Sequence, residues 1–283
     1  MSLFFVDNSC DLDTQQIKNL GIECFNLPTD FSGESLDDFD YPKFYSKLRK
    51  GIVISPKSLT EKEYISIFEP AFKMGDDIIY VHASSSIIDT TNLLSSKKKL
   101  STKFPDRRFE LIDSKNFSSG YGVVAFMLAL KYHNGDSIDE IVEYSHSIID
   151  SIAMYMIVDS LEPLSRSGKL YTNAVVGTAL NIKSIIAVDY DGKFKLVEKV
   201  SGKKRAISKL IQIIRQTGKN IADNLTIVNS SSSTVDTEFL LISIKEHFGE
   251  DIRLLSNYIS PINTSIVGSN VITLAFNVHK KTF

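Results

Sequence analysis

The sequence predicts an α/β protein of two domains: an N-terminal domain on a parallel sheet and a C-terminal α+β domain on a mainly antiparallel sheet. In the first half, short apolar runs end in polar loops that lead into segments of helical periodicity, the rhythm of a parallel sheet covered by helices. In the second half, Tyr190-Asp191-Gly192 separates two apolar runs and predicts a hairpin. The pattern changes near Ile157, which gives domains 1–157 and 158–283.

The elements of the first half follow from this rhythm. Apolar runs predict strands at residues 3–6, 22–27, 78–81 and 109–112. Helical periodicity predicts helices at residues 14–20, 41–50, 59–74 and 123–132. In parallel α/β sheets a ligand binds beyond the carboxyl ends of the strands. We therefore expect the loops Asp7–Asp11, Ser84–Thr91 and Asp113–Gly120 to wall a binding site.

The second half mixes strands and helices without the same alternation. Apolar runs predict strands at residues 185–188, 194–200, 225–228, 252–255 and 271–278. Helical patterns cover residues 204–216 and 237–247. A hairpin together with separate helices is typical of an α+β domain with an antiparallel sheet.

Composition limits the classes of function. The chain has 283 residues, of which 43% are hydrophobic and 23% charged, as in ordinary globular proteins. A formal charge of -2 provides no positive field for nucleic acid, so no nucleic-acid partner is expected. No apolar stretch is long enough to predict an integral membrane segment. The opening residues do not resemble a signal peptide, and we expect a cytoplasmic protein.

No catalytic or metal motif stands out. The chain has no GxSxG sequence for a nucleophilic serine, and its histidines lack metal-ligand spacing. Gly120 and Gly122 precede an apolar helix but lack the third glycine of a dinucleotide-binding loop. The residues therefore predict no catalytic group, no metal site and no cofactor.

Five segments spread over the whole chain resemble motifs of the DegV family, in the same order and spacing. They are VDNSCDL at Val6–Leu12, GDDIIYVHASS at Gly75–Ser85, LIDSKNFSSGYG at Leu111–Gly122, VDSLEPLSRSGKL at Val158–Leu170 and ALNIKSIIAVDYDGKF at Ala179–Phe194. The resemblance implies two α/β domains that bury one long-chain fatty acid between them. Such proteins are the binding components of bacterial fatty-acid kinase systems, and many hand their acyl chain to a separate fatty-acid kinase.

The resemblance also implies which residues surround the head group of the lipid. Ser55 replaces a hydroxyl residue of a family segment that binds the carboxylate, and Ser84 and Ser85 follow the third predicted strand. Ser118 and Ser119, in the third polar loop, are further lipid-binding candidates.

The sequence departs from the family at three other positions of the head-group site. Ile88 stands where relatives have a second serine, Ser201 where they have an arginine, and Ile266 where they have a histidine. Losing the arginine and the histidine removes the main cations that would bind a carboxylate or acyl phosphate. These changes indicate a divergent head-group site, and they argue either for a different lipid head or for the loss of the partnership with a kinase.

The sequence is thus interpreted as a non-catalytic bacterial carrier with an apolar tunnel between its domains. Two alternatives stay open. One is a phosphotransfer or hydrolytic enzyme at the interdomain cleft, and the other is an interaction protein that has lost its ligand. Acyl length, unsaturation, head-group charge, oligomeric state and physiological partner do not follow from the sequence.

Overall fold

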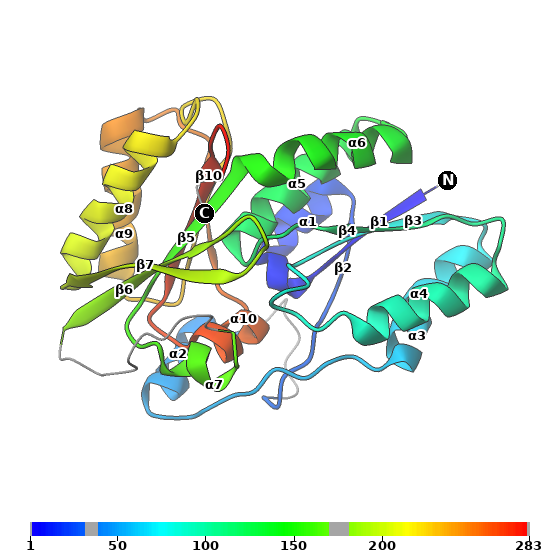
Figure 1. Ribbon diagram of the computed structural model, residues 1–283, viewed down its shortest axis with the longest axis horizontal. Helices are drawn as coiled ribbons and strands as arrows, with labels where there is room; N and C mark the ends of the chain where they lie inside the picture. Colours follow the sequence, from blue (N-terminus) through cyan, green and yellow to red (C-terminus); the bar gives the residue numbers. More distant parts are fainter. Residues whose placement is uncertain (1, 32–38, 170–180, 282–283) are drawn as a thin grey trace.

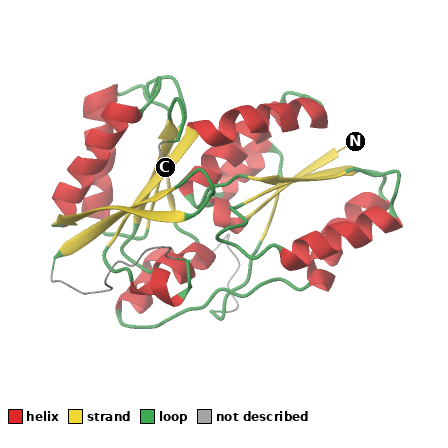
Figure 2. Cartoon of the chain, viewed as in Figure 1, coloured by secondary structure: helices red, strands yellow, loops and turns green. Residues whose placement is uncertain are grey.

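The computed structural model describes residues 2–31, 39–169 and 181–281. Its strands form two separate sheets, one of four and one of six strands, with helices on both (Figures 1 and 2). This confirms the predicted fold class. Of the family-like segments, the end at Leu170 and the start at Ala179 lie outside the described residues.

The first sheet is parallel throughout, with the strand order β2-β1-β3-β4. Its strands are β1 (Ser2–Asp7), β2 (Glu23–Phe25), β3 (Asp77–His82) and β4 (Phe109–Asp113). Their carboxyl ends meet at one edge, where His82 pairs with Asp113. The loops after β1, β3 and β4 therefore leave the sheet side by side, as the sequence predicts.

Helices cover both faces of this sheet because its side chains alternate. Phe5, Ile78 and Tyr80 point to the face covered by α3 (Glu61–Lys73) and α4 (Thr91–Lys103). Phe4, Val6 and Ile79 point to the opposite face. That face is covered by α1 (Thr14–Leu20), α5 (Ser119–His133) and α6 (Ile138–Ile148).

The second sheet has the order β7-β6-β5-β10-β8-β9. Its strands are β5 (Ile152–Val158), β6 (Ile182–Val188), β7 (Phe194–Ser201), β8 (Thr226–Ser230), β9 (Leu254–Tyr258) and β10 (Ile272–Asn277). Every neighbouring pair is antiparallel except β8 and β9. The predicted hairpin is confirmed as β6–β7, and Gly192 adopts the positive φ of 77° that its turn needs.

One face of the second sheet is covered by α8 (Lys203–Thr217) and α9 (Thr234–Phe248). Its other face packs on α5, which lies between the two sheets and contributes to a core shared by both (Figure 1). The predicted boundary at residue 157 falls inside β5, a strand of the second sheet. The division into domains 1–157 and 158–283 stays a prediction.

Three short helices gather on one side of the junction between the sheets (Figure 1). They are α2 (Tyr41–Arg49), α7 (Glu162–Arg166) and α10 (Pro261–Val267). All seven residues of α10 are buried, although the helix carries Asn263, Thr264 and Ser265. Among the described helices, none is long and apolar enough to span a bilayer.

Candidate functional site

The first polar loop leaves β1 as a single turn of 3-10 helix, Asn8–Cys10. Asp7 caps this turn by accepting a hydrogen bond from the Ser9 N–H at 2.8 Å. The Asp7 carboxylate is buried and also accepts from the Tyr80 hydroxyl at 2.8 Å. Burial raises its pKa above the usual value for aspartate, although these hydrogen bonds oppose the rise.

The second polar loop carries the serines that follow β3. The Ser84 hydroxyl donates to the Gly192 carbonyl at 2.8 Å, and the Ser86 hydroxyl donates to the Asp191 carbonyl at 2.9 Å. The Ser85 hydroxyl donates to Asp113 at 2.6 Å. A Cβ at position 192 would collide with Ser84 Oγ, so only glycine allows this approach. The Ser84 and Ser86 contacts join the serine loop of the first sheet to the β6–β7 hairpin of the second sheet.

Asp11 connects three segments at the centre of the junction. Its carboxylate accepts from the Ser118 hydroxyl at 2.5 Å, the Ser260 N–H at 2.8 Å and the Asn263 amide at 2.9 Å. Ser118 precedes α5, whereas Ser260 and Asn263 belong to α10 and its cap. Burial raises the pKa of Asp11 from its ordinary value of 3.8 to about 6, because the charged form is desolvated.

Ser119 begins α5 beside this network. Its side chain is fully buried, and its hydroxyl has no hydrogen-bond partner among the described residues. A buried polar atom without a partner is unfavourable, so this hydroxyl is a ready contact for a group or water that enters the junction.

Two positions that the family resemblance assigns to the head group are apolar and packed. Ile88 is half-buried and contacts the core clusters on both faces of the first sheet. Ile266, on α10, is 2% exposed and packs in the core shared by both sheets. Ile262, one turn earlier on α10, packs instead into the cluster of α3 and α4. Helix α10 therefore contributes apolar side chains to both core clusters.

Ser55 lies in an extended segment after α2. It is exposed, and its N–H donates to the Asp30 carboxylate at 2.7 Å. The preceding Ile54 is buried with Phe44 and lines a cavity of about 160 Å³. The other walls of this cavity include Gly268, just after α10, and Arg166 of α7. The Arg166 guanidinium forms an ion pair with Glu162 at 3.2 Å.

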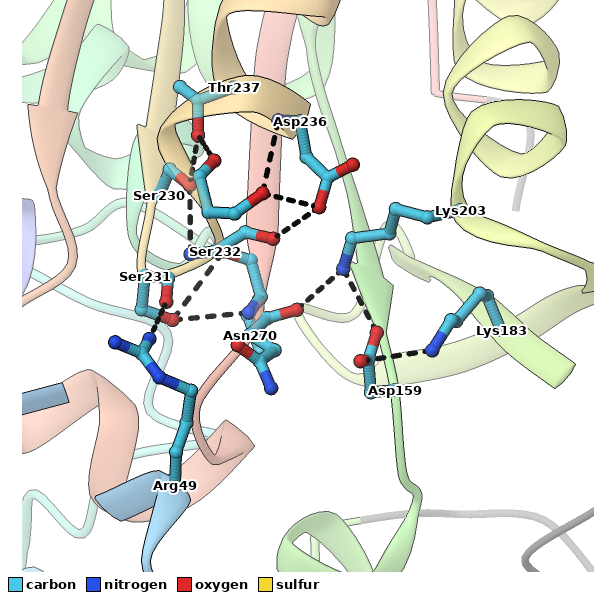
Figure 3. Close-up of polar contacts among 12 residues, drawn as sticks. Arg49, Asp159, Lys183, Lys203, Ser230, Ser231, Ser232, Asp236, Thr237 and Asn270 are labelled. Carbon is cyan, nitrogen blue, oxygen red and sulfur yellow. Dashed lines mark hydrogen bonds and ion pairs between the residues drawn. The ribbon is translucent and has the colours of Figure 1, made fainter. Parts of the chain in front are cut away.

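Ser201 ends the edge strand β7 and is exposed. A lysine two residues later does not take the place of the missing arginine, because Lys203 points back into the protein (Figure 3). Its ammonium donates to Asp159 at 2.9 Å and to the Asn270 carbonyl at 2.7 Å. Lys183 binds the same carboxylate at 3.0 Å. Both lysines are therefore held by Asp159 rather than directed toward a lipid head.

A larger cavity, of about 580 Å³, opens between the first polar loop and the connection from β9 to α10. Asn8 and Asp11 line one wall, and Asn257, Tyr258 and Ser260 line another. The first of the three predicted loops thus walls this cavity, whereas Ser84 and Asp113 are not among the residues that line it. No group of three or more histidine, cysteine or acidic residues able to hold a metal ion occurs in the described part of the chain.

Comparison with known proteins decides the family. A family model described as "Uncharacterised protein, DegV family" matches residues 4–278. The chain belongs to the DegV family. A DegV domain-containing protein of Clostridium perfringens is 29% identical over 282 residues, which cover 97% of this chain and 96% of the relative.

Solved DegV structures share the whole fold. A DegV family protein of Ruminococcus gnavus, refined with vaccenic acid, superposes with a TM-score of 0.83 at 19% identity and covers 97% of this chain and 99% of its own. The fatty acid kinase B3 protein of Streptococcus pneumoniae, loaded with linoleic acid, gives a TM-score of 0.82 at 16% identity, over 98% of this chain and 100% of its own. At these identities the likeness establishes the common fold.

The structure distributes the predicted site residues over four places. Ser84 and Ser85 share the loop on the hairpin, and Ser118 and Ser119 share the start of α5. The segments of Ser55 and Ile266 approach each other at the 160 Å³ cavity, while Ser201 lies exposed at a sheet edge. Their assignment to lipid binding stays a prediction. Arg166 lines the 160 Å³ cavity and was not among the predicted site residues, although it lies in the DegV-like segment Val158–Leu170.

Proposed function

We propose that this DegV protein binds one long-chain fatty acid or similar lipid between its two domains, as a carrier without catalytic activity. The observation that carries the proposal is the whole-chain match to DegV proteins whose structures contain vaccenic or linoleic acid. An acyl chain needs an enclosed apolar path with a few polar groups at one end.

The contacts of α10 support such a path at the junction. Ile262 reaches the core of the first domain and Ile266 the core shared by both sheets, so the helix supplies apolar surface on two sides. Ile88 lies between the same two clusters. Displacing these side chains by an acyl chain would keep apolar atoms in contact with apolar atoms.

A carrier role agrees with how the serines of the site are used. The hydroxyls of Ser84, Ser85 and Ser118 donate to a carbonyl or a carboxylate of the protein itself. Such hydroxyls hold loops in position, and among the described residues none of the three donates to a histidine, the base that commonly activates a nucleophilic serine. We therefore favour a carrier over the hydrolytic or phosphotransfer alternative.

The head-group end is proposed to favour a neutral or weakly held head. Ile88 and Ile266 present hydrocarbon where the family resemblance assigns a serine and a histidine, and Lys203 is held by Asp159. Arg166 remains near the 160 Å³ cavity, but Glu162 already neutralises its charge. Each lost hydrogen bond to a charged head removes about 1.5–3 kcal/mol, so the loss of two lowers affinity by about a hundredfold or more.

The experiment compares two ligands that differ in the head alone, oleate and oleyl alcohol, each displacing a fluorescent fatty acid from the protein. We expect both to bind, with the alcohol at least as tight as the acid. Ile88→Glu should weaken oleate more than the alcohol, because it places a second negative charge beside the head. Ile242→Glu is the matched control, since Ile242 is 55% exposed on α9. Failure of both ligands to bind at micromolar concentration would refute the carrier.

A further inference from the structure

The 580 Å³ cavity between the domains has the size of a small-molecule site, and nothing in the proposed lipid function uses it. Its lining comes from the loop after β1, from α1 and β2, from the start of α2 and from the β9–α10 connection. Binding sites are common at such junctions between domains. The chemistry of the walls shows what kind of molecule the cavity suits.

A buried carboxylate is part of the lining. Asp11 is 5% exposed and lines the cavity. Its three hydrogen bonds come from uncharged groups, those of Ser118, Ser260 and Asn263. Within the part of the chain that the structure describes, no lysine or arginine forms an ion pair with it. Buried charges in proteins are usually paired, so this carboxylate lacks the counter-charge that a bound cation would supply.

The rim adds to the negative character of the cavity. Among the described residues that line it, Asp11, Asp13 and Glu23 carry negative charge, and Lys18 carries positive charge. The Asp13 carboxylate caps α1 by accepting from the Gln16 N–H at 2.7 Å, and Glu23 is exposed on β2. Like charges that gather around a hollow raise the local concentration of the opposite ion.

An aromatic pair forms the opposite side. The rings of Tyr41 and Tyr258 stack with their centroids 4.8 Å apart and their planes 13° from parallel. Tyr258 is 52% exposed, so part of its ring is open to solvent beside the cavity. The electron-rich face of a tyrosine ring attracts organic cations, and its hydrocarbon edge accepts apolar groups.

The lining also contains asparagine amides, one of which has a free donor. Asn8 is buried and lines the cavity, and its Oδ1 accepts from the Leu27 N–H at 2.9 Å. Its amide nitrogen donates to none of the described residues and is not among their fully buried unpaired atoms, so it can be reached from the cavity. In contrast, Asn257 is engaged with Gln16 in a reciprocal amide pair, at 3.0 and 3.2 Å. That pair connects α1 to β9 beside the cavity.

We infer that this cavity is a second ligand site, which binds a small organic ammonium ion carrying an apolar group. The ammonium lies against Asp11 and the apolar group against Tyr258, with Asn8 free to donate to an oxygen of the ligand. The site is separate from the acyl path, because Ile88, Ile262 and Ile266 are not among its lining residues. A ligand there would contact both domains at once.

Other titratable groups near Asp11 do not compete for this role. Tyr41 and Tyr45 of α2 face it, and burial raises the pKa of each hydroxyl, so both stay neutral at physiological pH. Cys10, in the same loop, also has a raised pKa because it is buried next to Cys24. Helices α5 and α10 present only uncharged groups to the carboxylate. Among the described residues that line the cavity, the other charged ones are Lys18, Asp13 and Glu23.

The test uses the complete chain and a matched pair of probes. 2-Phenylethylammonium has a charged head, and 2-phenylethanol has a neutral head on the same apolar group. We expect the ammonium to bind with a dissociation constant of about 1 mM or tighter and the alcohol at least about tenfold more weakly. Titration calorimetry measures the affinity, and NMR shifts locate the probe. Affinity should fall as pH drops through about 6, where Asp11 takes up a proton.

Variants separate the proposal from general effects on the fold. Asp11→Asn should weaken the ammonium at least about tenfold. Asp223→Asn, which changes an exposed carboxylate outside the cavity, should leave affinity unchanged. If Asp11→Asn does not fold, Tyr258→Ala at the exposed rim provides the second variant, with an expected loss of about three- to tenfold.

Three results would overturn the inference. The first is equal binding of the ammonium and the alcohol, and the second is an equal loss of affinity in the Asp223 and Asp11 variants. The third is the absence of shifts at Asn8 and Tyr258 in the presence of millimolar ammonium. Because the probes are too short to fill an acyl path, this outcome is independent of whether the protein binds fatty acids.

Discussion

The charge on Asp11 should make the protein less stable as pH rises from acid to neutral. Its carboxylate is buried, and burial raises its pKa from 3.8 to about 6 in the folded chain. A raised pKa means that the folded state holds the proton more tightly than the unfolded state does. The stabilising contribution is therefore complete below pH 3.8 and is lost as pH rises through about 6.

The size of the effect follows from the difference between the two pKa values. A difference of about two pH units corresponds to about 3 kcal/mol over the whole range, at 1.36 kcal/mol per unit. Between pH 4.5 and 7 the protein loses about 2 kcal/mol of this stabilising contribution. This is a large part of the stability of an ordinary domain.

Urea unfolding of the wild type and of Asp11→Asn, at several pH values between 4.5 and 7, isolates this contribution. Other groups titrate equally in both proteins, so they cancel in the difference between their free energies of unfolding. We expect the wild type to lose about 2 kcal/mol relative to the variant over this range. A difference that is constant with pH would show that Asp11 does not have a raised pKa in the folded protein.

Three further predictions concern the hairpin contact, the head-group positions and the kinase. Ser84→Ala should lower the free energy of unfolding by about 1 kcal/mol, because the Gly192 carbonyl loses its donor. Ser101→Ala, at an exposed position of α4, is the control in urea unfolding. Ile266→His combined with Ser201→Arg should destabilise the protein by about 2–5 kcal/mol, because Ile266 is buried. An unchanged midpoint of urea unfolding would contradict the burial of Ile266. A fatty-acid kinase should phosphorylate acid bound to this chain slowly or not at all, and a radiolabelled phosphate assay showing ordinary turnover would disprove this.

Local signals explain why much of the fold could be predicted. Helix α1 begins at a capping box of Asp13 and Gln16 and ends at Gly21, whose φ is 66°, and its predicted bounds agree with those observed. The β6–β7 hairpin has its turn at the predicted place. These elements depend on neighbours in the sequence, so the sequence alone reveals them.

Other elements depend on tertiary packing and were missed. Strand β5 is a continuous apolar run, IAMYMIV, which has no period to distinguish a buried strand from a buried helix. Helix α10, PINTSIV, is short and buried on all sides, so it has no amphipathic pattern either. Both form only because other elements enclose them.

The site was harder to predict than the fold because its contacts join distant segments. Asp11 and Asn263 are 252 positions apart, and Ser84 and Gly192 are 108 apart. The sequence pointed to the loops that carry Asp11, Ser84 and Ser118, but not to the partners that those side chains meet. The buried position of Ile266 likewise depends on the packing of α10 and could not be read from one residue.

Mass spectrometry of the lipid that accompanies the purified protein tests the carrier function most directly. The protein would be produced in bacterial cells, weighed intact under native conditions, and then extracted with solvent for identification of the lipid. The account predicts a native mass raised by one lipid per chain, and recovery of a long-chain fatty acid or a neutral lipid with such a chain. A native mass equal to that of the bare chain, with no lipid in the extract and none taken up on incubation with oleate, would contradict it.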